Sequence, residues 1–377
     1  MKITLIGPVY PFRGGIAHYT TLLDQQLRKA GHQVQLLSFR RQYPAWLYKG
    51  KSDRDPSNHP LLTAEAIYLL DPFNPITWWQ TVKVIRNFAA DSCILQWWTS
   101  YWAPVWWVLA VFLALFTRIQ IGFLCHNVLP HEERRWDRWL ARSVLRLGSF
   151  WIVQSQAQQA QLESLIHKQP ISIAPHPAYA MFTEAKIDRL AAKAKLGIAS
   201  QSYLLLFFGM VRPYKGLDLA LRALAQIVQQ RSNVKLLVAG DFWGTKATYL
   251  ALAEELKVLN FVQMEDRYIP DEEVALYFSA ADMVMAPYRH LTGSGVMRVA
   301  ESFGLPIATW QNEHRRNENG DVNDKSTTTE ETKILRLVDA VLAGMEGNLQ
   351  NGAVTDPDSA DSWQRIVDII ERVGKDP

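Results

Sequence analysis

The chain has 377 residues, which is enough for two domains of ordinary size. With 48% hydrophobic and 20% charged residues, its composition is typical of a soluble globular protein and excludes a disordered chain. The net charge of +3 does not favour nucleic acid as a partner. Two cysteines, Cys93 and Cys125, are too few for a disulfide framework or a metal site of their own, and they fit a reducing compartment.

The first half of the chain alternates strand-like and helix-like runs. Residues 2–6 predict an opening strand, and the N-terminus carries neither an apolar targeting segment nor a cleavage site. We therefore expect a cytoplasmic protein without a signal peptide. Further strands are expected at residues 33–39, 67–70, 93–96, 119–125 and 150–154, with an amphipathic helix at 18–29 and a polar loop at 40–60.

The pattern restarts after Pro175-His176-Pro177. Strands are expected at residues 202–208, 234–239, 262–264, 282–286 and 306–309, and helices at 217–229, 247–256 and 271–279. Repeated strand–helix units imply parallel sheets covered on both faces. We predict an α/β protein with two doubly wound domains, residues 1–175 and 176–356. A last helix, residues 359–372, packs on either domain, and residues 311–332 form a polar loop.

Tryptophans cluster between residues 97 and 107. Polar residues and Pro104 interrupt this stretch, and its uninterrupted apolar part, 105–116, is too short to cross a bilayer core of about 30 Å. We expect a strand, a Trp-rich loop and a buried helix that has Pro104 in its first turn.

Two motifs follow predicted strands of the first domain, where parallel sheets bind ligands. Gly14-Gly15 lets the backbone approach a ligand closely, although an ordinary strand–helix turn explains it equally well. His126 can donate to a ligand hydroxyl or serve as a structural histidine. His131-Glu132 lacks the spacing of a zinc helix, so no metal is assigned.

Two further motifs follow predicted strands of the second domain. Arg212 and Lys215 lie at a strand-to-helix turn, where two cations suit a diphosphate better than they suit a solvated turn. Ser294-Gly295-Val296 opens a helix whose first N–H groups can face phosphates. Glu301 lies two turns further along, where a carboxylate can accept hydrogen bonds from ribose hydroxyls.

Basic residues recur at every fourth position from Arg134 through Arg138 and Arg142 to Arg146. With the neighbouring tryptophans they predict a basic amphipathic helix, which can lie on anionic lipid. A solvated face above core aromatics is the slightly favoured alternative.

Together, these motifs resemble the retaining nucleotide-sugar glycosyltransferases of the GT-B fold, close to family 4. The resemblance covers residues 1–310 and rests on the order of its markers: Gly14 to Ala17, His126-Asn127, Pro175 to Pro177, Gly209 to Gly216, and Ala281 to Glu301. It implies that Arg212 and Lys215 bind the donor diphosphate and stabilise the leaving group. It also implies that Glu301 holds the donor ribose and that His126 lies near the transferred sugar.

The resemblance implies further donor-binding residues: Gly14, Gly15, Thr292, Ser294, Gly295, Val296, and, by a weak match at the nucleobase, Asp266 and Tyr268. Trp97, Trp98 and Trp102 form an aromatic platform for the acceptor or fill the core. The implied activity transfers a sugar from a nucleoside-diphosphate sugar to a carbohydrate or lipid-linked acceptor, without a metal or another cofactor. Arg134, Arg138 and Arg142 would then bring the protein to the inner face of a membrane.

One departure from the family's pattern matters. The family usually carries a glutamate eight positions before the residue matched by Glu301, and here that position is Gly293. The sugar is then read by Thr292, Ser294 and backbone groups, or the chain is a weakened or inactive nucleotide-sugar-binding scaffold. A nucleotide-sugar epimerase or hydrolase on the same fold is the third and least favoured reading.

Overall fold

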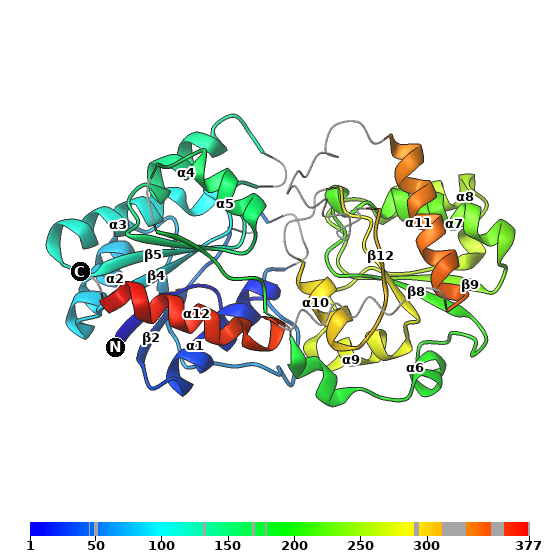
Figure 1. The fold of residues 1–377 in the computed structure, drawn as a ribbon, viewed down its shortest axis with the longest axis horizontal. Helices are drawn as coiled ribbons and strands as arrows, with labels where there is room; N and C mark the ends of the chain where they lie inside the picture. Colours follow the sequence, from blue (N-terminus) through cyan, green and yellow to red (C-terminus); the bar gives the residue numbers. More distant parts are fainter. Residues whose placement is uncertain are drawn as a thin grey trace. The chain divides into compact units, whose positions relative to one another are not determined.

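The computed structural model describes residues 1–44, 46–48, 52–130, 133–167, 170–177, 179–289, 294–310, 329–347 and 358–375. The chain divides into two compact units, each with its own parallel sheet (Figure 1). The first unit comprises Met1–Asp55, Pro60–Pro177 and Pro357–Pro377. The second comprises Pro56–His59 and Ala178–Asp356.

The first unit is built on a seven-stranded sheet in the order β3-β2-β1-β4-β5-β6-β7, in which every neighbouring pair is parallel. Its strands are β1 (Lys2–Ile6), β2 (Gln33–Phe39), β3 (Ile67–Leu70), β4 (Ser92–Trp97), β5 (Gln120–Cys125), β6 (Phe150–Val153) and β7 (Ile171–Ile173). The sequence did not predict β7, because a run this short carries too little periodicity to be recognised.

Helices cover both faces of this sheet. One face carries α2 (Pro75–Phe88), α3 (Ala103–Phe116), α4 (Asp137–Leu145) and α5 (Gln156–Glu163). The short helix η1 (Ser100–Trp102) directly precedes α3. The other face carries α1 (Gly15–Lys29) and α12 (Asp358–Lys375). The last helix therefore belongs to the first unit, where Ile366 and Ile370 are fully buried beside Ile3 and Leu5.

The second unit has a five-stranded sheet in the order β10-β9-β8-β11-β12, again parallel throughout. Its strands are β8 (Tyr203–Phe208), β9 (Val234–Ala239), β10 (Val262–Glu265), β11 (Met283–Met285) and β12 (Ile307–Ala308). Its helices are η2 (Ala180–Ala185), α6 (Arg189–Lys195), η3 (Pro213–Lys215), α7 (Leu217–Gln230), α8 (Lys246–Glu255), η4 (Leu259–Phe261), α9 (Asp271–Ala280), α10 (Gly295–Ser302) and α11 (Glu330–Met345).

These two sheets confirm the predicted α/β class and its doubly wound sheets. The strand order reverses between β1 and β4 in the first unit and between β8 and β11 in the second. Such a reversal opens a crevice at the carboxyl ends of the strands, where open α/β sheets bind ligands. The Arg212–Lys215 turn follows β8 and the Pro287–Arg289 turn follows β11, so both lie at the reversal.

The tryptophan cluster fills the core of the first unit. Trp97 and Trp102 are fully buried and Trp98 is 8% exposed, and Phe39 packs against Trp102 with a centroid distance of 4.4 Å. A buried indole offers no face to a sugar, which corrects the expected acceptor platform. The helix that follows is α3, whose outer face is exposed rather than buried as we expected. Among the described residues, no helix is long and apolar enough to cross a membrane.

Candidate functional site

Two turns meet at the carboxyl edge of the second sheet. Arg289 N donates a hydrogen bond of 2.7 Å to Tyr214 O, which joins the turn after β11 to the turn after β8. Gly216 has a φ of 73°, and a Cβ added to it would lie 2.3 Å from Pro287 O. This close approach admits only glycine and fixes the position of the preceding Lys215.

Lys215 is the buried cation of this edge, with a residue exposure of 7%. Among the described residues, its ammonium donates one hydrogen bond, a long contact of 3.4 Å to Phe208 O, and makes no ion pair. Its Nζ lies 5.6 Å from the centroid of the Tyr288 ring. Burial, and secondly the charge of Arg212, lower the pKa of Lys215 to about 7. An anionic ligand at this point would restore the charged form.

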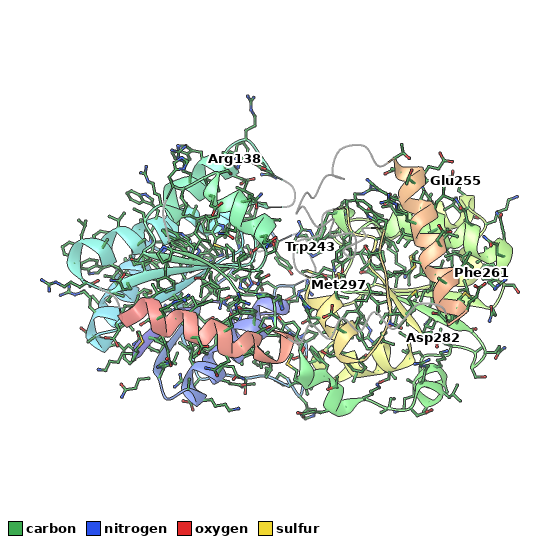
Figure 2. The ribbon with its side chains drawn as sticks, in the orientation of Figure 1. Arg138, Trp243, Glu255, Phe261, Asp282 and Met297 are labelled. Carbon is green, nitrogen blue, oxygen red and sulfur yellow. The ribbon has the colours of Figure 1, made fainter. Side chains whose placement is uncertain are left out.

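Arg212 is half-buried between two aromatic rings. Its guanidinium carbon lies 4.8 Å from the centroid of Trp243 and 5.3 Å from that of Tyr214. Trp243, which is labelled in Figure 2, follows β9, and its backbone N–H donates a 3.0 Å hydrogen bond to Val211 O at the same edge. The rings restrict the guanidinium plane, which prepares it to bind two oxygens of one phosphate group.

The start of α10 completes this group of residues. Ser294 caps the helix, since its Oγ accepts a 3.4 Å hydrogen bond from the N–H of Met297. A Cβ on Gly209 would lie 2.9 Å from Lys215 Nζ and 3.4 Å from Val296 Cγ2. The ammonium of Lys215 and the side chain of Val296, in the first turn of α10, therefore flank Gly209.

Glu301, Asp266 and Tyr268, which were also predicted for donor binding, lie on the second unit. Glu301 is in α10, where its carboxylate pairs with Arg298 at 2.9 Å. Asp266 follows β10, and its Oδ1 accepts a 3.2 Å hydrogen bond from Phe242 N. Tyr268 is half-buried in the same segment. Thr292 and Gly293 lie outside the described residues, as do His131 and Glu132 and most of the polar run 311–332.

His126 of the first unit is buried at the end of β5 and has partners for both ring nitrogens. Its Nε2 lies 2.8 Å from Gln96 Oε1, and its Nδ1 lies 3.3 Å from Gln154 Nε2. Burial, and secondly His176, lower the pKa of His126 to about 3, so the ring is neutral. Gln96 Oε1 can only accept a hydrogen bond and Gln154 Nε2 can only donate one, so the ring proton lies on Nε2. A role at a sugar hydroxyl therefore requires one of these hydrogen bonds to exchange.

The glycine pair expected at the first helix lies at its start. Gly14 is the N-cap of α1 with a φ of 103°, and Gly15 is the first residue of the helix. A Cβ on Gly14 would meet no atom within 4 Å, so the backbone angle and not a neighbour requires glycine there.

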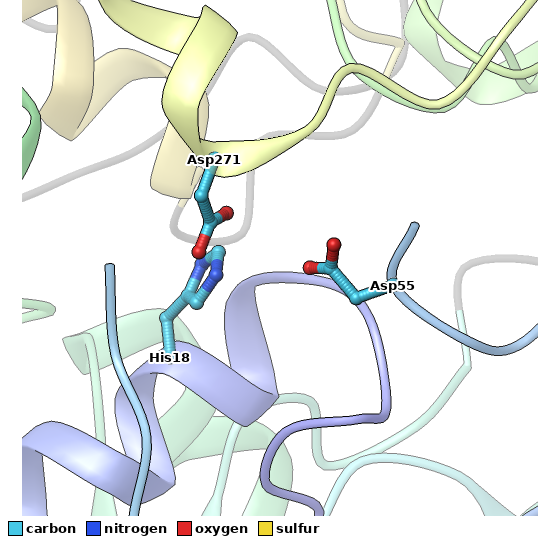
Figure 3. Close-up of side chains that lie close together, drawn as sticks. All are labelled: His18, Asp55 and Asp271. Carbon is cyan, nitrogen blue, oxygen red and sulfur yellow. The ribbon is translucent and has the colours of Figure 1, made fainter. Parts of the chain in front are cut away.

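Figure 3 shows His18 of α1 beside Asp55, with a ring nitrogen and a carboxylate oxygen within 4.8 Å in the first unit. Asp271, drawn in the same view, belongs to the second unit, where its N–H donates to Ser57 Oγ at 3.0 Å. One histidine and one carboxylate supply fewer ligands than a protein metal site needs, so we assign no metal to His18 and Asp55.

The arginines expected on one long helix extend beyond it. The helix α4 spans Asp137–Leu145, so Arg134 precedes it and only Arg138 and Arg142 lie on it. All three side chains are exposed, as are the nearby indoles of Trp136 and Trp139. The alternative in which these aromatics form the core is therefore wrong.

Sequence reasoning missed the aromatic residues that position the two cations. Trp243 follows the Gly240-Asp241 pair at the end of β9, and Tyr288 follows β11. Their signal was present, because both lie just beyond predicted strands, where ligand sites form. What was missing was the pairing order of the strands, which brings these turns together.

Two doubly wound units, each with its own parallel sheet, define a protein of the GT-B fold. Residues 13–178 match the model of Glycosyltransferase Family 4, and residues 188–308 match the model of Glycosyl transferases group 1. The chain therefore belongs to this glycosyltransferase family, with each unit contributing one of the two matches.

Individual relatives agree with this family. The chain is 32% identical over 124 residues to a D-inositol 3-phosphate glycosyltransferase of Segniliparus rotundus, over 32% of this chain and 27% of the relative. It thus spans about a quarter of that relative's length. The solved structure of Anabaena HepE in complex with UDP-glucose superposes with a TM-score of 0.67 at 16% identity, covering 100% of this chain and 98% of that one. WaaG, a glycosyltransferase involved in lipopolysaccharide biosynthesis, superposes with a TM-score of 0.62 at 17% identity, covering 98% and 99%. At these identities the two structures show the fold alone.

Proposed function

We propose that this protein is a retaining glycosyltransferase that moves a sugar from a nucleoside-diphosphate sugar to a hydroxyl acceptor. The observation that carries the proposal is the buried ammonium of Lys215, which lies beside Arg212 and has no ion pair among the described residues. A buried ammonium beside a second cation is costly unless an anion binds there. The fold neighbour that holds UDP-glucose supports a donor of this kind.

The chemistry follows from the charges at this edge. As the bond between the anomeric carbon and the diphosphate breaks, negative charge grows on the departing phosphate oxygen. Arg212, Lys215 and the N–H groups at the start of α10 stabilise this charge without reorganising. The same oxygen accepts the acceptor's proton while the acceptor oxygen bonds to the anomeric carbon on that face, which gives retention. Since two cations already face the diphosphate, the reaction needs neither a metal nor another cofactor.

The proposal also covers the acceptor and the place in the cell where the protein works. We infer that the acceptor is a lipid-linked or polysaccharide precursor and that the protein works in the cytoplasm at the inner face of a membrane. The exposed guanidinium groups of Arg134, Arg138 and Arg142 would attract it to anionic lipid headgroups. Glu301 would accept hydrogen bonds from the donor ribose, and Asp266 and Tyr268 would lie near the base.

A second function is a nucleotide-sugar-binding scaffold without transfer. Gly293 stands where the family usually has a glutamate, and both ring nitrogens of His126 already have partners in its own unit. Both features reduce the number of groups available to read the transferred sugar. A scaffold of this kind would still bind the nucleotide sugar at the diphosphate site, but it would not transfer the sugar.

The test uses the full chain and a panel of nucleoside-diphosphate sugars. Calorimetry measures binding, and release of free nucleotide measures turnover. Arg212→Ala should abolish both, whereas Arg231→Ala removes a surface guanidinium of the same unit and should change neither. Binding without release on any acceptor would favour the scaffold. Turnover that survives unchanged in Arg212→Ala would disprove the proposed mechanism.

A further inference from the structure

The exposed aromatic side chains of this protein are concentrated on the first unit. Among the described residues, the exposed large apolar side chains of the second unit are four leucines: Leu190, Leu250, Leu259 and Leu335. The first unit exposes tryptophans, phenylalanines and a tyrosine: Trp46, Tyr68, Phe73, Trp79, Trp107, Phe116, Trp136 and Trp139. Scattered leucines are ordinary on a protein surface, but a concentration of aromatics marks a surface that meets another phase or partner.

Four of these aromatic residues, Trp79, Trp107, Phe116 and Trp139, belong to one layer of helices, α2, α3 and α4, which we call the docking layer. The helix α3 packs against α2 on one side and against α4 on the other (Figure 1). Trp79 of α2 meets Phe112 of α3 edge-on, with centroids 5.5 Å apart, and Phe112 stacks on Phe116 at 5.8 Å. Aromatic rings therefore join the outer faces of α2 and α3.

The central helix α3 has 14 residues and no charged side chain. Its inner face is in the core, where Trp106, Leu109 and Leu113 are fully buried. Its outer face carries Trp107 and Leu115, which are 42% and 70% exposed. A helix that is apolar on all sides normally lies in a core or in a membrane. Here the outer face is covered only in part, because Trp107 and Leu115 remain exposed among the described residues.

Cations flank this apolar helix on both sides. Lys83 of α2 holds its ammonium 5.6 Å from the ring centroid of Trp79. On α4, Arg138 and Arg142 are exposed, and the indole of Trp139 between them is 69% exposed. Tryptophan beside arginine or lysine is the composition of a helix surface that lies in the headgroup region of a bilayer.

We propose that the docking layer binds a membrane containing anionic lipid and that the outer face of α3 inserts below the headgroups. This inference rests on the membrane contact in the proposed function and deepens it, and it does not depend on donor chemistry. The helix is roughly 21 Å long, shorter than a bilayer core of about 30 Å, so it lies in the plane of the interface. A second copy is the alternative occupant of this surface, and light scattering without vesicles tests for it.

The proposal predicts two components of binding that differ in their response to salt. Attraction between arginines and headgroups is screened as ionic strength rises, whereas burial of apolar side chains is not. Wild-type protein should sediment with vesicles of mixed phosphatidylcholine and phosphatidylglycerol at low salt. Part of this binding should persist at high salt. If the arginines alone bound the vesicles, all binding would be lost at high salt.

Two double variants and a control separate the components. Leu115→Gln with Phe116→Gln should lower vesicle partitioning by about tenfold at both low and high salt. Arg138→Gln with Arg142→Gln should remove the salt-sensitive part only. Leu190→Gln, on an exposed position of the second unit, should bind as wild type. All of these positions are exposed, so thermal unfolding and nucleotide binding should stay unchanged and report folded protein.

Quenching of tryptophan fluorescence by brominated acyl chains gives an independent readout. Emission should fall in wild type and much less in the Leu115→Gln, Phe116→Gln variant. Wild-type partitioning in that variant, or vesicle binding without quenching, would overturn insertion. Light scattering without vesicles provides a further outcome. Self-association that this variant abolishes would replace the membrane by a second copy and would also overturn the proposal.

Discussion

The ammonium of Lys215 occupies the space that a side chain at residue 209 would need. A Cβ on Gly209 would lie 2.9 Å from Lys215 Nζ, and the φ of Gly209 is 90°. Gly209 follows β8, and Lys215 lies six residues later in the same turn. The absence of a side chain at Gly209 leaves space for the Lys215 ammonium. Because glycine provides this room, the position of the buried charge depends on a residue without chemistry of its own.

With UDP as the probe of the proposed diphosphate site, Gly209→Ala should therefore reduce nucleotide binding more than it reduces stability. The added methyl group displaces the ammonium, and the positive φ costs about 1–3 kcal/mol of the free energy of unfolding. Calorimetry with UDP and urea unfolding measure the two effects. Gly197→Ala is the matched control, since Gly197 has a φ of 69° and a Cβ there would meet no atom within 4 Å. Equal UDP affinity in the two variants would contradict the crowding argument.

The lowered pKa of Lys215 should make diphosphate binding take up a proton. Its pKa is about 7 in the folded protein, so Lys215 is largely neutral at pH 8 in the free protein, while bound diphosphate favours its charged form. UDP affinity should fall as pH rises above 7. Titrations at pH 8 in buffers of different ionisation enthalpy measure the uptake. A heat that is the same in every buffer would show that Lys215 is already charged.

The same group should lower stability at neutral pH. The folded pKa lies below the ordinary value of 10.5, so the unfolded chain binds more protons between pH 7 and 10.5, and the contribution of Lys215 to stability rises with pH across that window. Lys215→Met should raise the free energy of unfolding at pH 7 by about 1–4 kcal/mol while abolishing UDP binding. Urea unfolding of wild type and Lys215→Met at pH 7 and at pH 10.5 measures this difference. A lower free energy of unfolding in Lys215→Met at pH 7 would argue against a costly buried charge.

His126 should remain neutral while the protein stays folded in mild acid. Its folded pKa of about 3 lies below the ordinary value of 6.5, so its contribution to stability is lost as pH falls from 6.5 towards 3. His126→Gln should weaken this acid dependence, although the lost ring packing lowers stability at pH 8. NMR of the ring protons, assigned through that variant, should show no titration between pH 8 and 5. A midpoint in that range would contradict the closed hydrogen-bond network.

Glu301 should matter only for ligands that carry ribose hydroxyls. Glu301→Gln should weaken UDP binding by about 1–2 kcal/mol, because an amide accepts hydrogen bonds more weakly than a carboxylate. It should leave binding of 2′,3′-dideoxy-UDP unchanged. Competition titrations with both nucleotides measure the difference. Arg298→Gln is the control for the ion pair at 2.9 Å, and an equal loss for both nucleotides would assign Glu301 a structural role.

The fold and the two cations could be predicted because their signals are local. The apolar run of β8 is buried between two helical layers, and Arg212 and Lys215 follow it directly in sequence. The partners of His126 could not be predicted in this way, since Gln96 and Gln154 come from the ends of other strands. Their meeting depends on the order of strands in the sheet, which no local pattern encodes.

The exposure of α3 shows a second limit of sequence patterns. Apolar residues on every side predicted a buried helix, but burial depends on what covers each face. In the first unit the sheet covers Trp106 and Leu109, and Leu115 is left at the surface. Composition determines how much of a helix is apolar, but not which neighbours it has.

The return of α12 to the first unit affects how the protein is made. Ile366 and Ile370 complete a core that includes Ile3 and Leu5 of β1. This core of the first unit can therefore form fully only after residues 358–375 have been synthesised. During synthesis, the ribosome completes the whole second unit before it releases this helix. A nascent chain stopped after residue 177 would expose the apolar surface of α1 and β1 to chaperones, whereas the second unit could reach its fold earlier.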